Sequence, residues 1–147
     1  MDRNAPERRV VVGVDGSPAS YEALRWAVRY AELIGAAVEA VAVWELPGLA
    51  GWSGPAADMD VDEDETRQRM RTEMNDVLGP TAAEAVQTVV VHGNAAEVLL
   101  RAADGAEALV VGSRGRHGFA SALLGSVSQH IAQHATCPVV ILRSGKK

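Results

Sequence analysis

The chain has 147 residues, of which 48% are apolar and 22% are charged, and this size and composition are typical of one globular domain. Its net charge of −5 argues against general nucleic-acid binding, and no apolar stretch approaches the ~20 residues that a membrane-spanning helix needs. The single cysteine, Cys137, excludes an internal disulfide and a zinc site of clustered cysteines. We expect residues 1–147 to form one cytoplasmic domain without a secretory signal, flexible over residues 1–7.

The first elements follow from short apolar runs and the residues that bound them. Residues 9–15 form a β-branched run without alternation, which is typical of a buried parallel strand. Ser17 can cap a helix that begins at Pro18, and apolar residues recur at helical spacing until Gly35 ends that helix. A second strand is expected over residues 38–44.

The rest of the chain continues this alternation. Residues 45–60 are rich in Gly and Pro and are expected to form a mobile loop, which contains Trp52. The acidic stretch 58–65 suits the start of a helix, which ends at Gly79-Pro80 and turns Met70 and Met74 toward the core. Further strands are expected over residues 87–92, 108–112 and 138–142. Two more helices are expected between these strands, one opened by Asn94 and Glu97 and one capped by Ser126.

The alternation of strands and helices predicts an α/β fold, an open five-stranded parallel sheet with helices on both faces in a Rossmann-like arrangement. Ligands of such sheets bind beyond the carboxyl ends of the strands, where the strand order reverses. The order 2-1-3-4-5 would place that point between strands one and three, and the order 3-2-1-4-5 between strands one and four. Strand one ends at Asp15 and strand four runs into the most Gly-rich loop of the chain, so the sequence favours the order 3-2-1-4-5.

The loop after strand four has the chemistry of a phosphate site. Gly112, Gly115 and Gly125 would let the backbone approach an anion closely, so that successive N–H groups converge on it. The helix that follows adds free N–H groups and a positive dipole end, and Ser126 and Ser128 add hydroxyl donors.

The distribution of charged residues along the chain also points to a phosphate site. All nineteen Asp and Glu residues precede Ala108, and five Lys and Arg residues follow it, Arg114 and Arg116 among them. An acid-free, basic segment favours a phosphate ligand. The pattern is no P-loop, because it lacks Gly-Lys-Ser/Thr, and no dinucleotide fingerprint, which would follow strand one as Gly-x-Gly-x-x-Gly.

Four separated segments resemble the nucleotide-binding form of the universal stress protein family. They are the run Val12-Gly13-Val14-Asp15-Gly16-Ser17, the approach to the Gly-rich loop over residues 108–115, the spacing Gly112-x2-Gly115-x9-Gly125-Ser126, and the ending over residues 137–142. The resemblance covers nearly the whole chain as a single domain, and only residues 1–7 and 45–60 fall outside it.

This resemblance implies the strand order 3-2-1-4-5 and an ATP molecule in the cleft between strands one and four. Asp15 would lie near the ribose with the backbone of Gly13 and Val14 beside it, and the adenine would be flanked by Val43 and Val111. Gly112 would face the ribose, and the phosphates would be held by Gly115, Arg116, Gly125, Ser126, Val127 and Ser128. A magnesium or manganese ion, when present, would be carried mainly by the phosphates. The resemblance also implies a homodimer formed through the last strand, Val139 to Arg143.

The expected function is regulatory ATP binding in the stress response. No Ser/His/Asp arrangement and no Cys/His pair can be placed in the cleft, so we assign no catalytic residue and expect at most slow ATP hydrolysis near Asp15. Three alternatives stay open: a slow ATPase or nucleotidyl-transfer enzyme on the same fold, a nucleotide-free dimeric interaction module, and a binder of cyclic nucleotides.

Two histidines and the cysteine near the C-terminus are the metal-ligating residue types of this part of the chain. His130 and His134 are four residues apart on a predicted helix, and Cys137 follows about one turn later. The Glu of a zinc-protease motif is missing and no further ligand has an obvious placement, so we expect no metal site, with one histidine exposed and the other partly packed. Cys137 is expected to be a small buried hydrophobe and not a reactive thiol.

Overall fold

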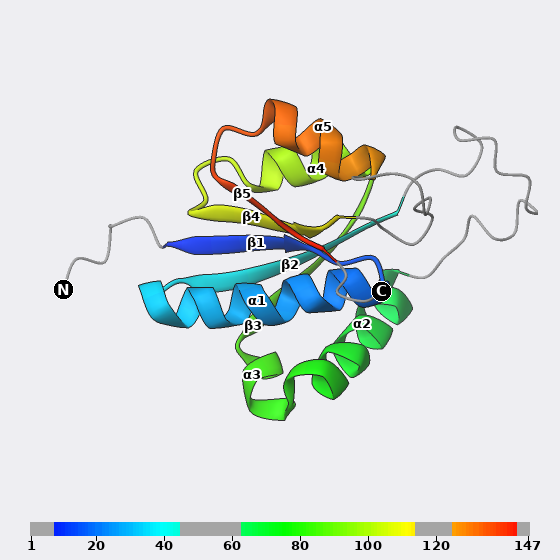
Figure 1. Cartoon of the computed structure of the whole chain (residues 1–147). Coiled ribbons are helices and arrows are strands. Elements are labelled where there is room, and N and C mark those ends of the chain that lie inside the picture. Colours follow the sequence, from blue (N-terminus) through cyan, green and yellow to red (C-terminus); the bar gives the residue numbers. More distant parts are fainter. Residues whose placement is uncertain (1–7, 45–62, 114–124, 144–147) are drawn as a thin grey trace, which may run out of the picture.

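Five parallel strands form one sheet in the order β3-β2-β1-β4-β5 (Figure 1). The computed structural model describes residues 8–44, 63–113 and 125–143. The strands are β1 (Arg9–Gly13), β2 (Ala37–Trp44), β3 (Val86–His92), β4 (Ala108–Gly112) and β5 (Val139–Leu142). All four neighbouring pairs are parallel. The predicted fold class and the predicted strand order are both confirmed.

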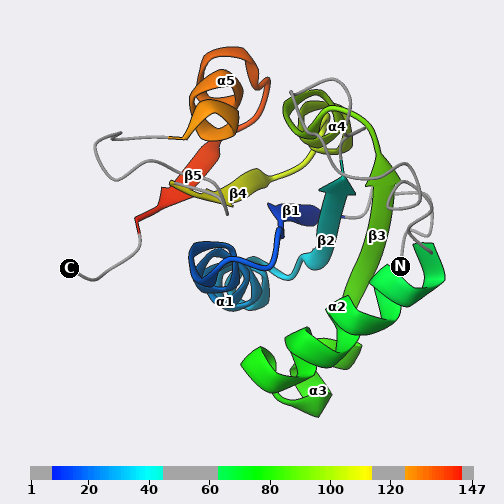
Figure 2. The ribbon, with the colours of Figure 1, turned by 90° about the vertical axis from the view of Figure 1, so that its right-hand side faces the viewer.

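Helices cover the two faces of the sheet, as Figure 2 shows in the view turned by 90°. One face carries α1 (Pro18–Ile34), α2 (Glu63–Leu78) and α3 (Pro80–Glu84), and the other carries α4 (Ala95–Ala102) and α5 (Ser126–His134). None of the helices in the described part of the chain is both long and apolar enough to cross a bilayer.

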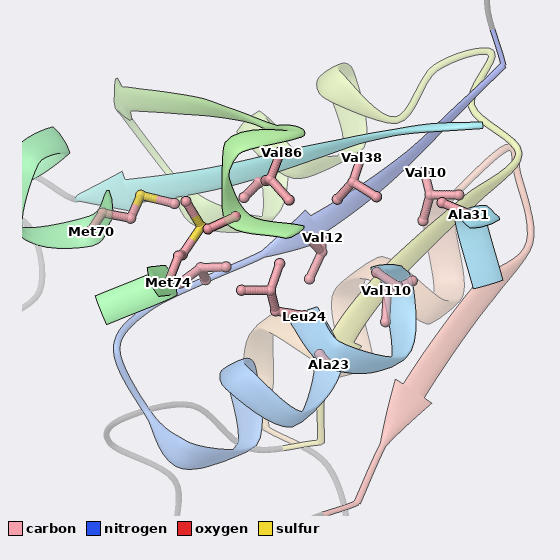
Figure 3. Close-up of a cluster of buried hydrophobic side chains, with 14 of the residues drawn as sticks. Val10, Val12, Ala23, Leu24, Ala31, Val38, Met70, Met74, Val86 and Val110 are labelled. Carbon is pink, nitrogen blue, oxygen red and sulfur yellow. The ribbon is translucent and has the colours of Figure 1, made fainter. Parts of the chain in front are cut away.

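The core between the sheet and α1 is built from alternate strand residues. Val12 and Val110 point to this face from the centre of the sheet and pack with Leu24 of α1, and all three are fully buried (Figure 3). Met70 and Met74 of α2 close the same core and are 5% and 1% exposed. The expectation that these methionines belong to the core is confirmed, and their unbranched side chains suit the irregular space between two helices and a sheet.

The remaining strand residues point to the opposite face and form a second core. Val11 and Leu109 pack there with Leu99 of α4 and Ile131 of α5, and none of these four side chains is more than 4% exposed. Because β1 and β4 are buried on both faces, they carry continuous apolar runs and not an alternating pattern.

The helix ends follow the capping residues that the sequence supplies. The Ser17 hydroxyl accepts a hydrogen bond from the Ser20 amide at 3.2 Å, and Gly35 ends α1 with φ of 71°. The Asn94 side-chain oxygen accepts from the Glu97 amide at 3.0 Å at the start of α4. These predicted caps are confirmed.

Two features of the helices differ from the expectation. Gly125 is the N-cap of α5 and has no side chain to offer, while Ser126 is already the first helical residue. Pro80, which was expected only to end the preceding helix, also begins the short helix α3, because proline is tolerated in a first helical turn. The expectations for residues 1–7 and 45–60, including Trp52, lie outside the described residues.

Candidate functional site

The two central strands part from each other at their carboxyl ends. β1 and β4 pair from Val10 and Ala108 up to Val12 and Val110. Beyond this point the Val14 amide donates to the Val41 carbonyl of β2 at 2.9 Å. The Ser113 amide donates in the other direction, to the Leu142 carbonyl of β5, at 2.7 Å. The sheet therefore opens between β1 and β4, at the topological switch point where open α/β sheets bind ligands.

A tight turn holds Asp15 at the tip of β1. The Asp15 carboxylate accepts a hydrogen bond from the Ser17 amide at 2.9 Å, and Gly16 takes the left-handed conformation with φ of 84°. The buried Ser20 hydroxyl donates to the Ser17 carbonyl at 2.9 Å and accepts from the Asp15 amide at 3.3 Å. Asp15 itself is exposed, and this network fixes its position at the tip of β1, beside the opening.

The end of β4 is held between the first turns of two helices. On the α1 side, a Cβ atom at Gly112 would lie 2.8 Å from the Ala19 Cβ, so only glycine fits there. On the α5 side, the buried Ser128 hydroxyl donates to the Gly112 carbonyl at 2.6 Å. Figure 1 shows both helices beginning at the right-hand end of the sheet, where β4 ends. Two positive helix ends are therefore brought to Gly112.

The first turn of α5 provides amides that can meet an anion. The amides of Ser126, Val127 and Ser128 lie in the first turn, where a helix offers no acceptor of its own. Within the described residues none of them donates to a backbone carbonyl, whereas the Gly125 amide donates to the Ser113 carbonyl at 2.5 Å. That bond fixes the start of the helix relative to β4 and leaves the next three amides for a ligand.

Apolar side chains border the opening on the α4 and α5 face. Val43 of β2 is half-buried and Val111 of β4 is 5% exposed, and both belong to the core of that face. A Cβ atom at Gly13 would meet Leu99 at 3.0 Å and Val111 at 3.4 Å, so Gly13 leaves room for these side chains to close over β1. Val14 is buried in the opposite core, next to α1, and can present only its backbone to the opening.

The structure describes most of the predicted site residues, and they lie at the edge of the sheet where the strands end. Val14 and Asp15 directly follow β1, and Gly125 directly precedes α5. The other described site residues lie in elements that end or begin at this edge of the sheet: Gly13, Val43, Val111, Gly112, Ser126, Val127 and Ser128. Gly115 and Arg116, like Arg114, lie outside the described residues. The Ser128 hydroxyl gives its hydrogen to Gly112, so this serine anchors α5, and the exposed Ser126 is the one whose hydroxyl faces solvent.

Sequence reasoning missed Ser20 and Ala19. Ser20 orders the Asp15 turn, and its only signal was a serine three residues after the helix cap. Ala19 lies against Gly112 although 93 positions separate the two in the sequence. A small side chain after Pro18 is not a pattern from which this contact can be predicted.

The histidines and the cysteine of the C-terminal region differ in part from the expectation. His130 and His134 are both exposed, so the expectation that one of them is partly packed was wrong. Cys137 is half-buried, and this burial raises the pKa of its thiol above the ordinary value, which disfavours the reactive thiolate. Within the described residues no group of three or more His, Cys, Asp or Glu side chains could hold a metal ion.

Comparisons with known proteins point to one family. A family model described as the universal stress protein family matches residues 7–143. A universal stress protein from Mycolicibacterium smegmatis is 34% identical over 148 residues, which are 97% of this chain and 50% of the relative. A universal stress protein from Mycobacterium tuberculosis is 34% identical over 136 residues, which are 91% of this chain and 44% of the relative. The chain therefore spans about half the length of the curated relatives it matches.

Solved structures of universal stress proteins superpose on this chain. Universal stress protein UspA from Lactobacillus plantarum superposes with a TM-score of 0.74 at 23% identity, covering 95% of this chain and all of that one, which shows the common fold. A universal stress protein in complex with cAMP superposes with a TM-score of 0.66 at 27% identity, covering 93% of this chain and 97% of that one.

Gly112→Ala should destabilise the protein by about 1–3 kcal/mol, because the new Cβ would overlap Ala19 and push the first turn of α1 away. Ala19→Gly would remove the contact at 2.8 Å but leave the Ala19 carbonyl carbon at 3.1 Å, so the double variant should recover part of this loss. Urea unfolding of the two single variants and the double variant measures the coupling. Strictly additive losses, or a Gly112→Ala variant as stable as the parent, would contradict the close approach of β4 and α1.

Proposed function

The chain belongs to the universal stress protein family, a family of the stress response, and we propose that it is a regulator that binds an adenine nucleotide, ATP foremost, where β1 and β4 part. The observation that carries this proposal is the convergence of two helix N-termini on Gly112 at the switch point of the sheet. Such a place combines positive helix ends with a backbone that a ligand can approach closely.

The phosphates are assigned to the first turn of α5. Three successive amides without a described carbonyl acceptor, those of Ser126, Val127 and Ser128, can donate to phosphate oxygens. Gly125 precedes them, and without a side chain it leaves the start of the helix open to a bulky anion. The acid-free segment from Ala108 onward favours the same assignment, because no carboxylate there repels the phosphates.

The nucleoside is assigned to the strand ends. The exposed Asp15 carboxylate, fixed by the Ser17 amide, suits the hydroxyl groups of a ribose. The apolar side chains of Val43 and Val111 suit the faces of a base on the α4 and α5 side of the sheet. Gly115 and Arg116 complete the proposed phosphate site by their place in the glycine spacing.

The structural relative in complex with cAMP supports a nucleotide ligand and keeps a cyclic nucleotide as the second candidate. A cyclic monophosphate would make fewer contacts with the α5 amides and the Ser126 hydroxyl than a triphosphate. Ser126→Ala should therefore weaken ATP binding more than cAMP binding, and the ratio of the two losses distinguishes the candidates.

A regulatory role of ATP binding is favoured over a role as an enzyme that hydrolyses ATP. Asp15 is the carboxylate that the described part of the site supplies, and hydrolysis would need a further group to position water. A magnesium or manganese ion that accompanies ATP would be carried mainly by the phosphates, because such ions keep several waters and take few protein ligands. Steady phosphate release that disappears in Asp15→Asn would instead favour the ATPase alternative.

Asp15→Asn should weaken ATP binding about tenfold or more, because it removes a charged acceptor from the ribose while the amide oxygen can still cap the Ser17 amide. The loss of affinity caused by Asp15→Asn should be smaller for an ATP analogue without the 2′- and 3′-hydroxyl groups, because neither the parent nor the variant can then make the ribose contact. Isothermal titration calorimetry measures the two affinities. Asp104 is an exposed acid just beyond the C-terminal end of α4, and the control variant Asp104→Asn should bind ATP like the parent. An unchanged affinity in folded Asp15→Asn would contradict the proposed ribose contact.

We also propose that the chain forms a homodimer through β5. All four side chains of β5 are apolar and half-buried, and β5 is one of the two edges of the sheet. The Pro138 carbonyl accepts a hydrogen bond from the Leu109 amide of β4, and the Leu142 carbonyl accepts one from the Ser113 amide just after β4. Successive residues of a strand direct their backbone N–H and C=O groups to opposite sides. The backbone polar groups of Val139 and Ile141 therefore point away from β4 and can pair with a second copy of the chain.

Ile141→Pro should weaken this dimer at least about tenfold, because proline removes an outward N–H group from the edge. Ile141→Val keeps both the N–H group and an apolar side chain and should dimerise like the parent. Sedimentation equilibrium over a range of protein concentrations measures the dissociation constant. A parent chain that stays monomeric, or an Ile141→Pro variant that dimerises equally well, would overturn the proposed interface.

A further inference from the structure

The exposed side of α5 carries a pair of histidine rings that the proposed nucleotide site does not use. The rings of His130 and His134 stack with their centroids 4.3 Å apart and their planes inclined by 26°. Both side chains are exposed, on the face of α5 away from the buried Ser128 and Ile131. The two imidazoles are thus neighbours in solvent, at the i and i+4 positions from which one ion can be reached.

A hydrogen bond sets the ring nitrogen that His134 can offer to a ligand. The His134 Nδ1 lies 2.9 Å from the His130 carbonyl oxygen. A carbonyl oxygen only accepts, so Nδ1 carries the hydrogen and donates it. In the neutral ring the lone pair is therefore on Nε2. Donation of one ring N–H to a backbone carbonyl is the arrangement that orients metal-binding histidines and fixes their tautomer.

The end of α5 also favours positive charge. His134 is the last residue of the helix and His130 lies one turn before it, where the unpaired carbonyl groups make the helix end negative. Neither α5 nor any residue after Ala108 supplies an Asp or Glu, so the ligands that α5 itself offers to a cation here are the two imidazoles. Nitrogen ligands of this kind suit zinc, copper and nickel, whereas magnesium and calcium prefer oxygen.

We propose that His130 and His134 form a two-histidine site for a divalent transition metal ion, with zinc as the representative ion. The two Nε2 atoms bind the ion after a small rotation of the exposed rings, and water completes the coordination. The sequence alone argues against a metal site, because the Glu of a zinc-protease motif is missing and no further ligand has an obvious placement. In the structure the two rings contact each other, both are exposed, and the tautomer of His134 is fixed. These three observations favour a metal site at this pair. The site is separate from the proposed nucleotide contacts and does not depend on them.

The test is a zinc titration of the chelator-treated full chain by isothermal titration calorimetry, without nucleotide. The parent should bind one equivalent of Zn²⁺, and His130→Ala and His134→Ala should each weaken this binding roughly tenfold or more. Both positions are exposed in a helix, where alanine is the best helix former, so the variants should keep the fold. His92→Ala, on β3, is the control and should bind zinc like the parent. Mg²⁺ should not compete.

A second readout identifies the nitrogen atoms. Imidazole ¹⁵N spectra of the parent should show Zn²⁺-dependent shifts at the Nε2 atoms of His130 and His134, with Nδ1 of His134 still protonated. Zinc should also raise the unfolding temperature of the parent and not that of the double variant. Equal zinc affinity in the parent and the double variant, loss of binding in His92→Ala, or coordination through Nδ1 of His134 would overturn the proposal.

Discussion

The backbone hydrogen bonds at the ends of β1 and β4 open the sheet at the place where we propose that a nucleotide binds. After Val12 and Val110 the two strands stop pairing, and each gives its next amide to its outer neighbour. This change of partners opens the middle of the sheet without leaving an amide of Val14 or Ser113 unpaired. The opening lies where the chain runs into α1 on one side of the sheet and toward α5 on the other, so the N-termini of both helices face it.

Small residues make this arrangement compact. Gly112 lets the first turn of α1 approach β4 until the Ala19 side chain touches it, and the Ser128 hydroxyl ties α5 to the carbonyl of the same glycine. One backbone position thus fixes both helices. Ser20 plays the corresponding part for β1, since its hydroxyl bridges the backbone on either side of Gly16 and holds the Asp15 turn. A preorganised site of this kind needs little ordering when a ligand arrives.

The sequence was sufficient to predict the architecture and the order of the strands. Continuous β-branched runs marked the buried strands, and a Gly-rich loop after strand four selected the strand order that the structure has. Contacts between distant segments were not accessible, because Ala19 and Gly112 carry no local pattern that joins them. The spacing of His130 and His134 showed that they could share a helix face, but only tertiary packing decides that both are exposed. The roles of Gly115 and Arg116 stay predictions from the glycine spacing.

An NMR titration of ¹⁵N-labelled protein with ATP tests most directly whether a nucleotide sits where the central strands separate. The account predicts saturable shifts of the amides of Asp15, Gly112, Ser126, Val127 and Ser128, with those of Asp104 and Ala106 at the opposite end of the sheet unchanged. Shifts centred on any other part of the molecule, or none at millimolar ATP, would contradict it.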